Sequence, residues 1–265
     1  MTSHTSANPT KPNVSWADLR AYKHWEIIKE LSLPLPWLAL SLWATSNGWY
    51  PVTIIAAFYF FLTGLRVTHN AFHYCLGLSK LVTDCVMFVL SVLMLGSLHA
   101  VQYTHLLHHR HCLTALDVEG AVAKQGFWET LYKGPLFPIH THKAALVGSK
   151  GTQKRWIKLE LLANILWLCT IWFWWDNELL QVHSVLMLVA YCFSAFFAVW
   201  TVHHDCDHES WDNSRTLRSQ WKCLVFYNMF YHIEHHLYPQ VPTCHLPELA
   251  KRLDAAGYTT HKRVI

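Results

Sequence analysis

The segment from Leu31 to Leu65, LSLPLPWLALSLWATSNGWYPVTIIAAFYFFLTGL, contains no charged residue. A helix needs about 20 apolar residues to cross roughly 30 Å of hydrocarbon. The segment Ser46-Asn47-Gly48, with Pro51 just beyond it, is a turn signal near the middle of the stretch. The stretch therefore predicts a helical hairpin in a membrane, with spans at about 31–45 and 51–68.

A second pair of apolar segments, which contain no Lys or Arg, follows at about 159–175 and 182–202, joined by a short polar link at 176–178. All 21 Lys and Arg residues fall before the first span, between Arg66 and Lys158, or after the fourth span. Positive charge concentrates on the cytoplasmic side of membrane proteins. We therefore expect an all-α, multi-pass integral membrane protein with four spans in two hairpins and both termini in the cytoplasm.

The segment at about 81–98 is also apolar, but it contains Asp84. If it crossed the membrane, the basic residues of 110–158 would lie on the opposite side from Arg66 and Lys80. It is therefore predicted to be an amphipathic helix that lies in the membrane interface.

The domain organisation follows from these spans. Residues 1–30 are polar and lack the apolar core of a signal peptide, which predicts a cytoplasmic N-terminal tail. Residues 31–265 are expected to form a single membrane domain. Its central segment, about 69–158, and its C-terminal region, about 203–265, would together build a helical cytoplasmic cap.

The composition agrees with a membrane protein and excludes several other classes. Hydrophobic residues make up 52% of the chain and charged residues only 14%. The net charge of +4 is too small to favour nucleic acid as a partner. The eight cysteines form no C-x-x-C pair, which argues against zinc ribbons and thioredoxin-type redox sites.

The chain contains 20 histidines, an unusually high number, and most of them lie in four clusters. Residues three and four apart share one face of a helix. Two clusters follow predicted span ends and two lie in the predicted cap, so all four can converge on one site at the cytoplasmic surface. The candidate metal ligands are His69, His73, His105, His108, His109, His204, His208, His232, His235 and His236.

In the third cluster, residues 203–208, the sequence leaves open which of two adjacent histidines is a metal ligand. His203 competes with His204 as a ligand, and His204 is preferred because it is four residues from His208. Acidic residues near the clusters could fix the second nitrogen of each imidazole. These residues are Asp117, Asp205, Asp207 and Glu234.

The number of histidines indicates the kind of site. About ten imidazoles are too many for one zinc ion, which takes four ligands, and they suit two metal ions. Imidazole binds Zn, Cu, Fe and Ni alike, so the residues alone indicate a pair of first-row metals. The H-E-x-x-H signature of metalloproteases is absent.

The stretch from Asn228 to Pro242, NMFYHIEHHLYPQVP, resembles the C-terminal histidine box of the membrane fatty-acid desaturase family. His105–His109 resembles the middle box of that family, and His69–His73 resembles the first. The resemblance covers about 65 to 250. It implies four transmembrane helices under a cytoplasmic cap, with an interfacial helix between the first two boxes.

The resemblance also implies the chemistry. Family members use a di-iron centre and O₂ to take hydrogen from a methylene group of a lipid-like chain. His204 falls where some members have an Asn that reaches iron through water. The His-Pro-Gly-Gly turn of a fused b-type cytochrome is absent here, so electrons are expected from a separate donor such as a ferredoxin, a rubredoxin or a membrane b-type cytochrome.

Basic residues of the predicted cap could dock an acidic donor by electrostatic steering, although a solvated or lipid-facing role suits them equally. They are Lys124, Lys133, Lys143, Lys150, Lys154 and Arg155.

Desaturation of a fatty-acyl or similar chain is the preferred reaction. A hydroxylase or ketolase on the same scaffold differs only in the fate of the first radical, and no residue decides between them. A zinc-dependent membrane hydrolase would need no O₂ or reductant. A metal transporter would place histidines inside its spans, whereas here they lie at span ends and in the cap.

Overall fold

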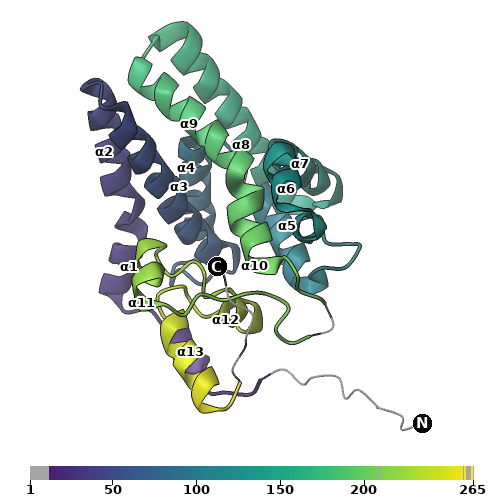
Figure 1. Ribbon diagram of the computed structural model, residues 1–265. Helices are drawn as coiled ribbons and strands as arrows, with labels where there is room; N and C mark the ends of the chain where they lie inside the picture. Colours follow the sequence, from purple (N-terminus) through teal and green to yellow (C-terminus); the bar gives the residue numbers. More distant parts are fainter. Residues whose placement is uncertain (1–11, 209, 259, 261–263, 265) are drawn as a thin grey trace.

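The structure is a computed structural model that describes residues 12–208, 210–258, 260 and 264. The chain is 71% helical, and the described residues contain no strand. Two helical hairpins rise from a basal layer of short helices, as Figure 1 shows. The all-helical fold class predicted from the sequence is confirmed.

The first hairpin consists of α2 (Pro34–Ser46) and α3 (Tyr50–Phe72). Each helix has a proline in its first turn, where the missing N–H costs no hydrogen bond. Gly48 reverses the chain between them with a φ of +71°, a left-handed conformation that glycine adopts without strain. The predicted turn is confirmed, and α3 extends past the predicted span end to carry His69 beyond it.

The second hairpin contains two π-helical segments. Its first arm is α8 (Gly151–Cys169) followed by η3 (Thr170–Trp175), and its second arm runs from α9 (Glu178–Ser194) through η4 (Ala195–Trp200) into α10 (Thr201–His203). Asn177 caps α9, because its side-chain oxygen accepts a hydrogen bond from the N–H of Leu180 at 3.1 Å. Both η3 and η4 are π-helices, which are wider than an α-helix and rotate the residues that follow them.

Among the described residues, three helices are long and apolar enough to cross a membrane, namely Tyr50–Phe72, Gly151–Trp175 and Glu178–His203. The first predicted span, at about 31–45, corresponds to α2, which has 13 residues and a length of about 20 Å. A fourth candidate is the pair α4 (Lys80–Met94) and α5 (Leu98–His111), which passes the same test only if the two helices count as one broken span.

The helix predicted at about 81–98 corresponds to α4, which ends at Met94, and a separate helix, α5, begins at Leu98. The axes of α4 and α5 differ in direction by 111°. Leu95 ends α4 in a left-handed conformation with φ of 60°, and the hydroxyl of Ser97 then caps α5 by accepting from the N–H of Ala100 at 3.1 Å. α4 packs against α3, α8 and α9. The break turns α5, which carries the middle histidine box, away from the direction of α4.

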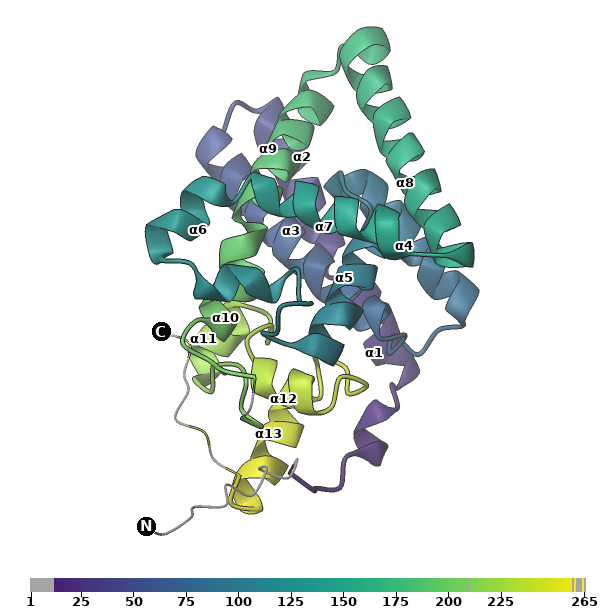
Figure 2. The same ribbon diagram turned by 90° about the vertical axis from the view of Figure 1, so that its right-hand side faces the viewer.

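Three short helices complete the central segment: η2 (Gly120–Lys124), α6 (Phe127–Lys133) and α7 (Leu136–Gly148). Figure 2 shows α6 and α7 lying across the second hairpin, below the point where α8 and α9 meet. These helices expose Trp128, Ile139 and Val147 beside the exposed Lys143. Apolar side chains next to a flexible lysine are typical of a membrane interface.

The basal layer lies opposite the hairpin turns in Figure 1. It contains η1 (Ala17–Arg20), α1 (His24–Ser32), α11 (Gln220–Val225), α12 (His232–Leu237) and α13 (Leu246–Ala255). Leu19, Ile233 and Leu249 meet in its buried core. This core joins the start of the described chain to its C-terminal helices.

The predicted boundary at residue 30 falls inside a packed helix. Glu30 on α1 is buried and accepts two hydrogen bonds from Arg66, both at 2.7 Å, and one from Asn70 at 2.9 Å. A guanidinium and a carboxylate bonded in this bidentate way hold each other in a defined geometry. The residues from 12 to 30 are therefore attached to the domain, while residues 1–11 of the predicted tail lie outside the described part of the chain.

Candidate metal centre

Four elements that are distant in sequence bring nine histidines together. The end of α3 supplies the first cluster, the second half of α5 the middle box, the end of α10 one residue, and α12 the last box. The nine histidines are His69, His73, His105, His108, His109, His203, His232, His235 and His236.

The first group consists of His69, His73, His105 and His235, whose nearest ring nitrogens all lie within 4.8 Å of one another. His109 adjoins this group. Its Nε2 is 2.8 Å from Nε2 of His235 and 3.1 Å from Nε2 of His105. Five imidazoles therefore face one point.

The second group consists of His108, His203, His232 and His236. The Nε2 of His203 is 3.0 Å from that of His108 and 2.9 Å from that of His232, and the Nε2 atoms of His232 and His236 are 3.1 Å apart. The two groups are neighbours, because the rings of His109 and His236 stack with their centroids 4.4 Å apart. The arrangement is that of a site for two ions.

The outer nitrogens of His108 and His203 decide what their inner nitrogens can do. Nδ1 of His108 is 2.7 Å from a carboxylate oxygen of Asp117, and Nδ1 of His203 is 3.0 Å from the carbonyl oxygen of Asn213. Carboxylates and carbonyls only accept hydrogen bonds, so both Nδ1 atoms carry a proton. In the neutral imidazoles the two Nε2 atoms are then bare, and they face each other at 3.0 Å.

Two facing lone pairs repel each other unless a cation lies between them. Imidazole nitrogens bind a first-row metal ion at about 2.1 Å, so two ligands at a right angle lie about 3 Å apart. The separations of 2.8 to 3.1 Å among the inner nitrogens fit that value. The chemistry of the donor set therefore fits a pair of metal ions.

Burial keeps the imidazoles of the last box ready to bind metal. It lowers the pKa of His232, His235 and His236 well below the ordinary value, and the neighbouring histidines add to the effect. The neutral form is the metal-binding form. These three side chains therefore need no deprotonation before an ion binds at neutral pH.

Asp117 is the acid that orients His108. Burial raises the pKa of this carboxyl, but the hydrogen bond and charge of His108 together with two backbone N–H groups outweigh the burial, so the pKa lies below its usual value. The N–H groups of Leu113 and Gly120 also donate to Asp117, each at 2.8 Å. A Cβ at Gly120 would lie 2.1 Å from the Asp117 carboxylate, so glycine permits this close approach.

Glu119 is a second acid at the site, which the sequence analysis did not identify. It accepts a hydrogen bond from the hydroxyl of Thr104 at 2.6 Å, and one of its oxygens is 3.6 Å from Nδ1 of His105. Burial raises the pKa of Glu119 to about 7. Its position two residues after Asp117 was the available signal, because both follow the middle box in one short loop.

The structure places His203, and not His204, in the cluster. The ring of His204 stacks on Trp200 with centroids 4.1 Å apart, and its Nε2 is 3.3 Å from Asp205. His208 is exposed. The preference for His204 rested on an α-helix through 204–208, but the helix ends at His203, and the preceding π-helix η4 has already rotated the register.

The other acids named from the sequence have different partners. Glu234 pairs with Arg218 at 2.5 Å and accepts from the hydroxyl of Thr216 at 2.7 Å. Asp207 accepts from the N–H of Ser210. Of the four acids proposed from the sequence, Asp117 is the one that contacts a histidine of the cluster.

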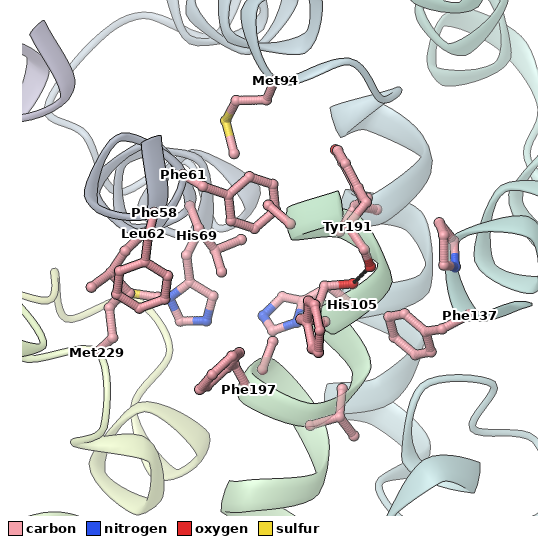
Figure 3. Close-up of a pocket in the computed structure, with 18 of the residues that line it drawn as sticks. Phe58, Phe61, Leu62, His69, Met94, His105, Phe137, Tyr191, Phe197 and Met229 are labelled. Carbon is pink, nitrogen blue, oxygen red and sulfur yellow. Dashed lines mark hydrogen bonds between the residues drawn. The ribbon is translucent and has the colours of Figure 1, made fainter. Parts of the chain in front are cut away.

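A largely apolar cavity of about 310 Å³ reaches the first group of histidines. Figure 3 shows His69 and His105 at its centre, with Phe61, Met94 and Tyr191 on one side and Phe197 on another. Glu119 and His232 also line it. A cavity of this size and polarity suits a small apolar ligand or part of a chain.

The family model described as Fatty acid desaturase matches residues 47–264, which is most of the chain. A search of curated proteins with this chain found no match. Membership in this family implies an oxidoreductase of the desaturase or hydroxylase type that acts on lipids in membranes, and the long apolar helices agree with an integral membrane protein. The resemblance seen in the histidine boxes is confirmed: the chain belongs to the fatty acid desaturase family.

Proposed function

We propose that this protein is an O₂-dependent di-iron oxidoreductase that desaturates a fatty-acyl or similar lipid-like chain. The observation that carries the proposal is the facing pair of bare Nε2 atoms on His108 and His203, within a cluster of nine imidazoles. The family generally uses a di-iron centre, and imidazole is a suitable ligand for iron. The nine clustered histidines are the proposed ligands.

Each part of the site has a role in this proposal. The iron pair, when bound with O₂, supplies the oxidising power that an unactivated methylene group requires. The apolar cavity excludes water and holds the chain against His69 and His105. Asp117 and the carbonyl of Asn213 hold protons on the outer nitrogens of two ligands, so that the inner nitrogens stay free for metal.

The proposed topology keeps the four-span, cytoplasmic-cap arrangement, with 31–265 as one domain. Its support is the distribution of Lys and Arg along the chain. Whether the fourth span is α2 or the α4–α5 pair can be decided by labelling single cysteines placed at the helix ends. Both termini are expected to react from the cytoplasmic side.

A separate protein is the proposed source of electrons. The exposed Lys124, Lys150 and Arg155 are candidates for docking an acidic donor. Lys143 lies among exposed apolar side chains of α7, and Lys133 pairs with Glu129 at 2.6 Å. These two lysines therefore suit the membrane interface better than a protein partner.

The test measures iron and product in the same preparations. Purified wild type is expected to hold two irons per chain and to oxidise lipid chains when given O₂ and an electron donor. His108→Ala and His235→Ala are expected to lose both properties while still inserting into membranes. His140→Ala is the matched control, because His140 is an exposed histidine on α7 outside the cluster.

Two outcomes would overturn the proposal: zinc in place of iron with hydrolytic activity, or full turnover without O₂ or reductant. Mass spectrometry of the product decides the reaction. A new double bond supports desaturation, whereas an added oxygen atom would assign the chain to the hydroxylases or ketolases.

A further inference from the structure

The cavity that reaches the histidines opens sideways, through the wall formed by two membrane helices. Several of its lining residues are also exposed on the molecular surface. Ile54 and Phe58 on α3 are 56% and 37% exposed, and Phe193 on α9 and Phe197 on η4 are 43% and 40% exposed. A residue that both lines a cavity and is exposed marks an opening, and this opening lies between two helices that are long and apolar enough to span a membrane.

Two aromatic rings narrow the opening. The rings of Phe58 and Phe197 meet edge to face with their centroids 6.0 Å apart, one from each side of the gap. Figure 3 shows Phe58 beside Leu62 and Phe197 below the imidazoles. Phe197 lies on the π-helix η4, and π-helical turns frequently occur at functional sites. The pair is placed to act as a gate.

A continuous apolar stripe leads from the gate to the metal centre. Phe58 and His69 are eleven residues apart, which is three helical turns and about 16 Å along α3. They therefore share a face, and Phe61, Leu62 and Leu65 lie between them on the cavity wall. Nothing charged lines this stripe, so it suits a hydrocarbon chain and not a polar head group.

The helix α11 lies next to the cytoplasmic end of the same cavity in the proposed topology. Its Trp221, Leu224 and Val225 are exposed, and the following residue, Phe226, lines the cavity. Exposed Trp and aliphatic side chains on a short helix are typical of a segment that dips into the membrane interface. The cavity therefore meets the bilayer along its side.

We infer that the substrate is the hydrocarbon chain of a lipid that resides in the bilayer, and that it enters between α3 and η4 past Phe58 and Phe197. This inference rests on the proposed function for the chemistry, but the entry route does not. The alternative is a chain delivered from water by a soluble carrier, which would reach the histidines without passing the gate.

The entry route is tested by photocrosslinking of the reconstituted, iron-loaded protein. The vesicles contain a phospholipid with a diazirine in the middle of one acyl chain, and labelled peptides are mapped by mass spectrometry. We expect label at 54–72 and 193–202. The double variant Phe58→Trp/Phe197→Trp is expected to lower labelling of 65–72 roughly tenfold, as misfit in an apolar passage commonly does, and Phe58→Ala/Phe197→Ala is expected to raise it.

Phe173→Trp is the matched control, because Phe173 is 83% exposed on η3 and does not line the cavity. It is expected to label as wild type does. Equal labelling of 65–72 in the double Trp variant and wild type would overturn the gate. Strong labelling of 65–72 by a water-soluble acyl thioester with the diazirine, together with none by the phospholipid, would overturn the lipid-borne substrate.

A turnover assay separates this inference from the proposed function. In the double Trp variant the iron content is expected to stay at the wild-type level, while kcat/KM for a phospholipid-borne chain falls by the same factor as the labelling. If no oxidised product forms with wild type but the labelling pattern holds, the proposed function fails and the lateral entry stands. If product forms with wild type but the double Trp variant is labelled as strongly as wild type, the proposed function stands and the lateral entry fails.

Discussion

The nine-histidine cluster and the surroundings of His99 both contain buried histidines, but the partners of those histidines differ. In the nine-histidine cluster, the inner nitrogens face other imidazoles, while outer nitrogens face acceptors such as Asp117 and Asn213. At the junction of α4, α5 and α8, both nitrogens of His99 face carboxylates: Nδ1 is 2.7 Å from Glu160, and Nε2 is 3.4 Å from Asp84.

The difference separates the proposed metal site from a hydrogen-bonded structural site. His99 has no nitrogen left for a metal, because Glu160 and Asp84 occupy both, and its ring stacks on Trp156 at 5.2 Å. Glu160 also accepts hydrogen bonds from the hydroxyl of Ser97 at 2.7 Å and from the N–H of His99 at 3.0 Å. It therefore holds the first turn of α5, the helix that carries the middle histidine box. Burial alone does not identify a ligand; the direction of the second nitrogen does.

The largest effect is expected at His203. His203→Ala removes a proposed ligand from the second group, so iron content and turnover should fall by more than the roughly 100-fold that loss of an orienting partner can cause. His204→Ala, which removes a ring stacked on Trp200, should retain both properties. Metal analysis and product formation on the two purified variants provide the measurement. Loss in His204→Ala with retention in His203→Ala would reverse the assignment.

Glu160→Ala removes the hydrogen bonds between α8 and the first turn of α5 and should leave the proposed metal site intact. The substitution removes the acceptor of the His99 Nδ1 and of the Ser97 hydroxyl, both of which are buried. Loss of one partner of a buried pair costs about 3–5 kcal/mol of stability. We expect a lower thermal-denaturation midpoint in detergent, with the iron content per folded chain unchanged. A folded Glu160→Ala protein that holds no iron would mean that this region is part of the centre.

Asp117→Asn is expected to weaken metal binding by about 10–100-fold, because the amide is uncharged and one of its two ends is an NH2 donor, which cannot accept from His108 or from the backbone N–H groups that Asp117 binds. Competition with a chelator measures the change. The comparison variant is Asp84→Asn, which alters an acid beside His99 and should not change the metal affinity. Equal metal affinities of Asp117→Asn and Asp84→Asn would show that Asp117 does not orient a metal ligand.

The smallest effect concerns His245, a histidine that is neither a proposed ligand nor fully buried. Hydrogen bonds with the Cys244 side chain, the Leu19 carbonyl and Glu26 raise the pKa of His245 to about 9, against the effect of its burial. Because the folded state holds this proton more tightly than the unfolded state, the protonated imidazole stabilises the fold. The stabilisation is complete below pH 6.5 and is lost as the pH rises through 9.

The contacts of His245 connect η1 and α1 to the start of α13. We expect residues 12–23 to become more sensitive to protease above pH 9 than below 6.5, with an effect of about 1 kcal/mol or less. His245→Gln should remove this pH dependence. An unchanged pH dependence in that variant would assign it to other groups.

The helical fold class, the turn at Gly48 and the apolar hairpins could all be predicted from the amino-acid sequence, because composition and turn residues act locally. The sequence also identified eight of the nine clustered histidines, since spacings of three and four residues place side chains on one helical face. The ligand role of these residues stays a prediction. The sequence also named Asp117 as an acid that could orient an imidazole, because it follows the middle box closely in the chain, and the structure places it against His108.

The sequence could not predict that His203, and not His204, joins the cluster, because the π-helix η4 changes the register in a way that a spacing of 3.6 residues does not predict. Only the tertiary structure revealed the break between α4 and α5, the position of Glu119 and the attachment of Glu30 to Arg66. Each of these depends on contacts between residues far apart in the chain. The apolar cavity belongs with them, because its walls come from helices that meet only when the two hairpins pack together.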